Sequence, residues 1–195
     1  MAPSNQNELI RMINTSVLID DRPSAFRYPR GAGEIDNTNL NYDSLEIGKG
    51  IIIKEGNDVA ILNLGTRMQS CEEAIKLLNS HNIYPTLADA RFAKPIDKNL
   101  IDSLLDHHKY LITIEEGSSG GFGSTVLNYI HNERRKSTLT KVNNIYFPDK
   151  FIDHQSPEDQ YKEIGMDADS IANKITKFYQ DNIVDFETYN KNIKN

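Results

Sequence analysis

The sequence predicts an α/β fold: a mostly parallel sheet with helices on both faces, preceded by a separate helix and strand. From residue 50 to residue 180, short apolar runs alternate with amphipathic segments of helical length. One of these runs, "AILNLG", is mostly apolar without alternation, which is typical of a strand buried on both faces. The stretch "GAGEIDNTNLNYDSLE" is rich in Gly, Asn and Asp, so we expect a domain boundary there.

The first predicted elements are a helix and a short strand. In "SNQNELIRMINTSVLID" the apolar residues recur at three- and four-residue spacing, which indicates an amphipathic helix. Asn5 and Glu8 have the spacing of a capping box, so Asn5 is the predicted cap. "SAFRYP" then reads as a strand that ends at Pro29.

Beyond the boundary, strands and helices are predicted to alternate. The expected strands are "GKGIIIKEG", "DVAILNLG", "IYPTLADAR", "KYLITIEEG" and "KVNNIYFPD". The expected helices run from Thr66 to about His81 and through "IDKNLIDSLLDHH", "SGGFGSTVLNYIHNERR" and "DADSIANKITKFYQ". Thr66 and Asp97 are the predicted caps of the first two. The final "DNIVDFETYNKNIKN" has weak periodicity and is either a frayed helix or a docking tail.

Composition excludes several classes of function. The 195 residues carry a net charge of -6 and no basic stripe, so nucleic-acid binding is not expected. No apolar stretch approaches the length of a membrane span, and no secretory signal is visible, so we expect cytoplasmic residence without a membrane partner. Cys71 lies in a helical pattern and is expected to be a buried structural thiol. No two histidines have metal-binding spacing; no metal site is expected, and His154 is interpreted as a surface residue.

Three arginines are the candidate anion-binding residues. Arg27 and Arg30 lie three positions apart in an extended run, so their side chains point to roughly opposite sides. Local sequence favours one in an ion pair and one in solvent; the alternative is contact with a phosphate, whose oxygens a guanidinium matches. Arg91 follows a predicted strand at its carboxyl end, where open parallel sheets bind ligands. Lys94 nearby is expected to be solvated.

The loop "EEGSSGGFGS" lies between a predicted strand and a predicted helix. Such a glycine-rich loop can hold phosphate with backbone N–H groups, but the GxGxxG order is not met. Close packing of the turn against a neighbouring segment is therefore favoured. Of Glu115 and Glu116, we expect one to be packed and the other solvated, the alternative being a catalytic acid or base.

Several motifs, in order, resemble the C-terminal third of the 1-deoxy-D-xylulose-5-phosphate synthases, thiamine-diphosphate enzymes of the transketolase group. They are "DDRPSAFRYPRGAG", "LEIGKG", "VAILNLGT", "DARFAKPID", "TIEEGSSGGFGS" and "FPDKFIDHQSPEDQYKEIGMDADSI". The sequence departs from the family at Gln155, where glycine is usual, and at Gly117, where asparagine is usual.

The resemblance implies an activity for the whole enzyme. The family condenses pyruvate with D-glyceraldehyde 3-phosphate and releases CO2, in the non-mevalonate route to isoprenoids. Thiamine diphosphate supplies the chemistry, and the family's Mg2+ and diphosphate ligands lie in an earlier domain. The resemblance thus implies a fragment that binds no cofactor and is inactive without the remaining domains of the same enzyme. The complete enzyme would be a homodimer. No catalytic residue is expected in this chain.

The same resemblance assigns domains and site residues. It makes residues 3–33 the tail of a pyrimidine-binding domain, 34–45 a connector, 46–180 a transketolase-type C-terminal domain and 181–195 a tail. Arg27 and Arg91 match arginines that line the acceptor-phosphate pocket. Tyr28 and Arg30 are weaker candidates, as pocket wall or interface. Two alternatives remain: a noncatalytic transketolase-C-like interaction module, and a fragment of a dehydrogenase E1 β-type subunit.

Overall fold

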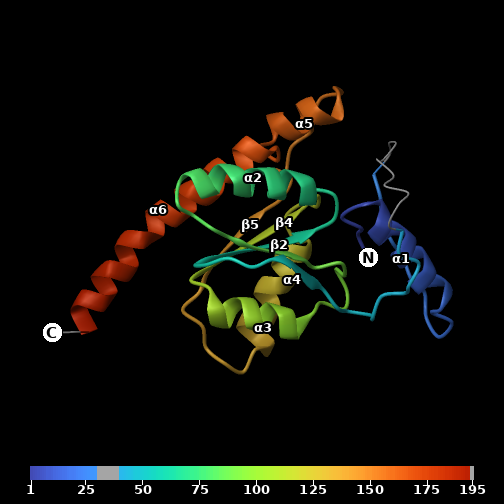
Figure 1. Ribbon diagram of the computed structural model, residues 1–195, viewed down its shortest axis with the longest axis horizontal. Helices are drawn as coiled ribbons and strands as arrows, with labels where there is room; N and C mark the ends of the chain where they lie inside the picture. The colour runs from blue at the N-terminus through green and yellow to red at the C-terminus, as the bar shows by residue number, and fades with distance from the viewer. Residues whose placement is uncertain (30–39, 194–195) are drawn as a thin grey trace.

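A five-stranded sheet forms the centre of the molecule (Figure 1). The computed structural model describes residues 1–29 and 40–193. The strands are β1 (Ile51–Lys54), β2 (Val59–Leu64), β3 (Thr86–Asp89), β4 (Tyr110–Glu115) and β5 (Lys141–Ile145), in the spatial order β1-β3-β2-β4-β5. All neighbours are parallel except β1, which is antiparallel to β3. The predicted mostly parallel sheet is confirmed.

Helices cover both faces of this sheet, as predicted. Figure 1 shows α2 (Met68–Ser80) and α6 (Ala168–Ile193) on one face, and α3 (Lys98–His107) and α4 (Phe122–Asn128) on the other. Because side chains alternate along a strand, β2 and β4 supply apolar residues to both sides. One layer includes Val59, Ile61, Ala74, Ile75, Leu78, Ile112, Ile114, Ile171 and Ile175. The other includes Ala60, Leu62, Ala88, Ile101, Leu104, Leu105, Leu111, Phe122 and Val126.

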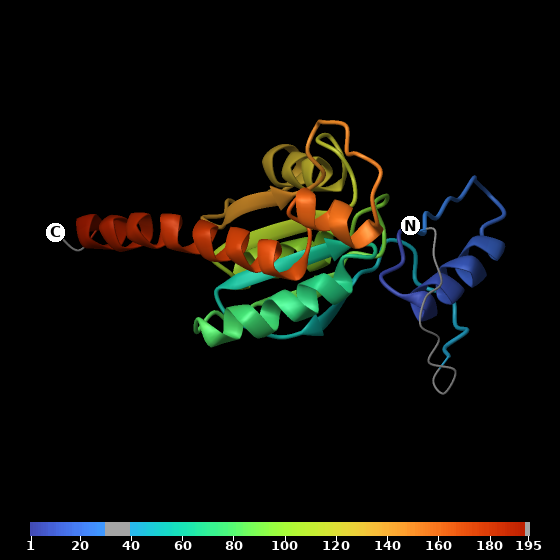
Figure 2. The same cartoon turned by 90° about the horizontal axis from the view of Figure 1, so that it is seen from above.

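Two short helices and a long one complete the sheet domain, a name we use for residues 46–182. The π-helix η1 (Tyr129–Glu133) continues α4, and α5 (Pro157–Glu163) precedes α6. Helix α6 continues to Ile193, well into the stretch predicted as a frayed helix or tail, and projects past the sheet (Figure 2). Across the described residues, no helix combines the length and apolar character that a bilayer crossing requires.

Residues 1–29 form an N-terminal arm that lies at one end of the sheet (Figure 2). Its helix α1 (Gln6–Val17) is capped as predicted, because Asn5 Oδ1 accepts a hydrogen bond from Glu8 N at 2.9 Å. The strand predicted at "SAFRYP" is not formed. The Met1 ammonium donates to Ala25 O at 2.8 Å, and Arg27 N donates to Met1 O at 3.1 Å. Residues 25–27 therefore form backbone hydrogen bonds with Met1, and one residue is too short a partner for a β-strand pair.

The other two predicted caps have different outcomes. Asp97 caps α3, since its Oδ1 accepts from Leu100 N at 3.0 Å. Thr66 does not cap α2, which begins two residues later without a side-chain cap. Its hydroxyl instead donates to Glu116 Oε1 at 2.5 Å. A tertiary partner at the end of β4 has thus displaced the local capping interaction.

Candidate functional site

The carboxyl ends of β2, β3 and β4 meet at one edge of the sheet, which we call the carboxyl edge. The start of the N-terminal arm covers part of it. Ala2 N donates to Arg91 O at 3.0 Å, and only 2% of Ala2 is exposed. Ser4 Oγ donates to Asp89 Oδ2 at 2.5 Å, at the end of β3. Open parallel sheets bind ligands at this edge, so the residues that line it are the candidate site.

Arg91 lies at the carboxyl edge with its backbone in an unusual conformation. Its φ angle is +56°, in the left-handed region that residues with a side chain rarely adopt. The N–H of Arg91 donates to Asp89 Oδ1 at 2.9 Å, while its carbonyl accepts the bond from Ala2. Interactions on both sides hold this conformation, and strained residues of this kind cluster at functional sites.

The guanidinium of Arg91 is buried and bound to α1. Its Nη2 lies 2.8 Å from Glu8 Oε1, and 9% of Arg91 is exposed. Arg11 Nη1 reaches the same Glu8 oxygen at 3.1 Å. Arg91 Nε and Glu8 Oε2 are buried without a hydrogen-bond partner within the described part of the chain. The ion pair therefore uses one N–H group of Arg91 and one carboxylate oxygen of Glu8.

Arg27 reaches the same edge from the other end of the N-terminal arm. Its Nη1 donates to Glu116 O at 3.1 Å, just beyond β4. Tyr28 is 62% exposed beside it. Arg30 lies outside the described residues. The backbone of Arg27 is hydrogen-bonded to Met1, and that of Arg91 is hydrogen-bonded to Ala2. Their guanidinium groups, in contrast, are bound to different elements.

Asp89 is the buried carboxyl group of this edge. Burial raises the pKa of Asp89 to about 6, although the hydrogen bonds from Ser4 and from Arg91 N act in the opposite direction. The charge of Glu8 raises this pKa further, and that of Arg91 lowers it. Asp89 therefore titrates in a pH range in which an ordinary aspartate is fully ionised.

The glycine-rich loop after β4 is filled by a side chain of the protein itself. Glu115 Oε2 accepts from Phe122 N at 2.9 Å, and Glu115 Oε1 accepts from Gly123 N at 2.8 Å. A Cβ atom at Gly117 or Gly121 would lie 2.5 Å from Glu115 Oε2, so a larger residue there would have to displace the Glu115 carboxylate. The favoured interpretation, close packing of the turn, is confirmed. These N–H groups already have an anionic partner and do not form a phosphate cradle.

Glu116 is the acceptor of a second polar cluster. Its Oε1 accepts from Thr66 Oγ1, from Arg67 Nε at 2.9 Å and from Tyr161 Oη at 2.7 Å. The Arg67 guanidinium also lies over the Tyr161 ring, 3.4 Å from its centroid. Burial and the bond to Glu116 raise the pKa of Tyr161. The prediction that one glutamate of the Glu115–Glu116 pair is solvated is therefore wrong, because both carboxylates are engaged.

The remaining predicted positions are structural or exposed. Cys71 is buried, and burial raises the pKa of its thiol, as expected for a structural cysteine. His154 and Lys94 are exposed, as predicted. Among the residues that the structure describes, no three His, Cys, Asp or Glu side chains are grouped to hold a metal ion.

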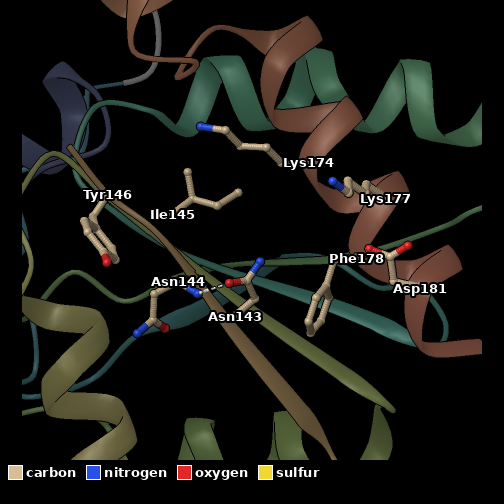
Figure 3. Close-up of a pocket in the computed structure, with 8 residues that line it drawn as sticks. All are labelled: Asn143, Asn144, Ile145, Tyr146, Lys174, Lys177, Phe178 and Asp181. Atoms are coloured by element: carbon tan, nitrogen blue, oxygen red, sulfur yellow. Dashed lines mark hydrogen bonds between the residues drawn. The ribbon is translucent and has the colours of Figure 1, made fainter. Parts of the chain in front are cut away.

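A groove of about 330 Å³ lies elsewhere, between β5 and α6 (Figure 3). Asn143 and Asn144 line it from the edge strand, and Lys174, Lys177 and Asp181 line it from the helix. Lys174 is engaged at the end of α5, where its Nζ donates to Gly165 O at 2.6 Å. None of the predicted site residues lines this groove.

Sequence reasoning missed the partners that surround these arginines. Glu8 is 83 positions from Arg91, and Arg67 is 49 positions from Glu116, so no spacing in the sequence connects them. Glu8 had an assigned role as part of a capping pattern, which concealed its contact with Arg91. Asp89 stands two residues before Arg91 at the end of a predicted strand. This short spacing is the one local feature of the sequence that could have indicated a partner of Arg91.

Comparisons with known proteins agree with this architecture. A family model described as the transketolase C-terminal domain matches residues 48–171. The probable 1-deoxy-D-xylulose-5-phosphate synthase 2, chloroplastic, of Oryza sativa subsp. japonica is 45% identical over 174 residues, covering 88% of this chain and 24% of the relative. The 1-deoxy-D-xylulose-5-phosphate synthase 1, chloroplastic, of Cannabis sativa is 47% identical over 175 residues, with the same coverage. The chain thus spans about a quarter of the length of these curated relatives.

A solved structure is similar to this chain in both fold and sequence. It is described as a split gene transketolase, inactive beta4 tetramer, and it shares 29% identity and a TM-score of 0.62 with this chain. The similarity covers 69% of this chain and 43% of that one. The family match over most of the sheet domain, together with these relatives, shows that the chain belongs to the transketolase C-terminal domain family.

Proposed function

We propose that this chain is the C-terminal part of a 1-deoxy-D-xylulose-5-phosphate synthase. The complete enzyme would condense pyruvate with D-glyceraldehyde 3-phosphate, release CO2 and use thiamine diphosphate. Support comes from two synthases that are 45% and 47% identical over 88% of this chain. The same similarity disfavours a dehydrogenase E1 β-type subunit. Cytoplasmic residence remains a prediction.

Within that enzyme, we propose that Arg27 and Arg91 bind the phosphate of the acceptor aldehyde. The observation that supports this most directly is that both arginines lie at the carboxyl edge, each one backbone hydrogen bond from Met1–Ala2. Two guanidinium groups suit a phosphate dianion, and fixing that end of the substrate would orient the aldehyde for attack. Tyr28, exposed next to Arg27, would contribute to the pocket wall.

We propose that the described residues of this chain do not themselves hold thiamine diphosphate or its Mg2+. They contain no group of three side chains able to hold a metal ion, and the glycine-rich loop that could have bound a diphosphate is filled by Glu115. We therefore propose that other domains of the enzyme hold the cofactor, and we assign none of its chemistry to residues of this chain.

A second candidate function is a noncatalytic, self-associating module. The solved relative is described as a split gene transketolase, inactive beta4 tetramer, and this similarity favours self-association without activity for the present chain. The two functions are compatible, because the same domain would be inactive in isolation and would supply subunit contacts within the complete homodimer. Native mass spectrometry of the purified chain would distinguish a monomer from an oligomer.

The kinetic test uses a complete synthase that carries this sequence. We expect Arg91→Ala to raise the KM for glyceraldehyde 3-phosphate by roughly 30- to 100-fold, the loss expected for a charge-assisted phosphate contact. The KM for pyruvate should change little. Arg135→Ala, at an exposed arginine after η1, is the matched control. Equal effects of Arg91→Ala on both substrates would argue for a purely structural arginine.

A further inference from the structure

We propose that Glu8 is an internal competitor for the anion site at Arg91. In the ligand-free chain its carboxylate occupies the guanidinium, and a phosphate monoester takes that guanidinium over when it binds. The inference rests on the proposed phosphate-binding role of Arg91 and adds to it the residue that sets the affinity. The Arg91–Glu8 distance of 2.8 Å, with both side chains buried, is the starting observation.

The way Glu8 occupies Arg91 is incomplete. An arginine presents its Nε–H and one Nη–H along one edge, a fork that matches two oxygens of a carboxylate or phosphate. Glu8 contacts Nη2 only, and Arg91 Nε is buried with no partner among the described residues. Glu8 Oε2 is likewise buried and unpaired. Because unpaired buried polar atoms are unfavourable, an anion that used both N–H groups would bind Arg91 better than Glu8 does.

Glu8 has a second cation to which its charge can move. Arg11, one turn along α1, lies 3.1 Å from the same Glu8 oxygen and is more exposed than Arg91. Release from Arg91 therefore leaves Glu8 paired, which avoids the cost of stranding a buried charge. The exchange requires only that the Glu8 side chain turn toward Arg11, without displacement of α1.

The backbone of Arg91 would stay fixed during this exchange. Its N–H is held by Asp89 and its carbonyl by Ala2, and neither contact involves the guanidinium. Arg91 is therefore preorganised whichever anion it binds. Glu8 then determines affinity in two ways, by occupying the guanidinium and by repelling an entering dianion.

The test is a titration of the 195-residue chain with inorganic phosphate, followed by NMR. The readouts are the side-chain Nε–H of Arg91 and the backbone amides of Ala90 and Phe92. Glu8→Gln removes the negative charge but keeps an oxygen that can accept from Nη2, so Kd should fall about tenfold relative to the wild-type chain. Glu8→Asp keeps the charge but shortens its reach, so Kd should fall by less. This second variant allows the comparison even if the glutamine variant does not fold.

Two further variants separate the possible outcomes. Glu55→Gln makes the same charge change at the turn between β1 and β2, away from the carboxyl edge, and should leave Kd unchanged. Arg91→Lys should abolish the response. If Arg91→Lys abolishes phosphate binding but Glu8→Gln leaves Kd unchanged or raises it, the competitor role is wrong and Arg91 remains a phosphate site. If no variant responds to phosphate, the proposed function of Arg91 is wrong, and the role of Glu8 falls with it.

Discussion

The sheet domain and the N-terminal arm are held in place by different forces. In the sheet domain, every residue of β2 and β4 is buried, and apolar layers lie on both sides of these strands. The described part of the arm has only small apolar contacts: Met12 clusters with Leu45 and Phe92, and Ala2 packs at the margin of one sheet layer. Its polar attachments include those from Ser4 to Asp89, from Ala2 and Glu8 to Arg91, and from Arg27 to Glu116.

This difference separates stability from positioning. Burial of apolar area is non-directional, and it stabilises the sheet domain as a unit. Hydrogen bonds and ion pairs contribute less net free energy but require defined geometry. The arm should therefore open before the sheet domain unfolds, while its polar contacts set the position of Arg27 and Arg91 when it is closed.

The largest expected effect comes from the centre of the sheet. Ile112 is fully buried in the middle of β4, so Ile112→Ala should lower the free energy of unfolding by about 3–5 kcal/mol. Urea denaturation followed by circular dichroism measures this loss. Leu127→Ala, at an exposed leucine on α4, should have a much smaller effect. If Ile112→Ala reduced the exchange protection of α1 but left the free energy of unfolding unchanged, the sheet domain would not be the source of global stability.

An intermediate effect is expected in the arm. Met12 is fully buried, but its cluster is small, so Met12→Ala should lower the free energy of arm opening by about 2–3 kcal/mol. Hydrogen exchange should show faster exchange in α1 and unchanged protection in β4. Ile13→Ala, at the next residue on the same helix and 42% exposed, is the matched control. Equal loss of protection in both regions would mean that the arm and the sheet domain unfold together.

The same division explains what the sequence predicted. The strand and helix pattern of the sheet domain was predictable because apolar periodicity records burial, and Asn5 and Asp97 were correct caps because their partners are three residues away. The strand at "SAFRYP" was wrong because local propensity cannot supply a neighbouring strand. The ion pair of Glu8 with Arg91 and the cluster around Glu116 join distant segments, so only tertiary structure could reveal them.

The smallest expected effect lies where the two regions meet, at Asp89. Burial raises the pKa of Asp89 from its ordinary 3.8 to about 6 and outweighs the hydrogen bond from Ser4 of the arm, which lowers it. Because the closed state holds the proton more tightly than the open state, Asp89 stabilises closure most at low pH. This contribution is lost as the pH rises from about 4 to about 6 and stays constant above that range.

Arm opening measured by hydrogen exchange, corrected for the intrinsic pH dependence of exchange, should become easier by about 1–2 kcal/mol between those pH values. Asp89→Asn should remove the dependence, because its amide oxygen can still accept from Arg91 N and its amide can donate to Ser4. Glu8 and Arg91, whose charges also act on Asp89, remain unchanged in that variant. Arm opening that became harder with rising pH would show that Asp89 is ionised in the closed state and that its hydrogen bonds outweigh its burial.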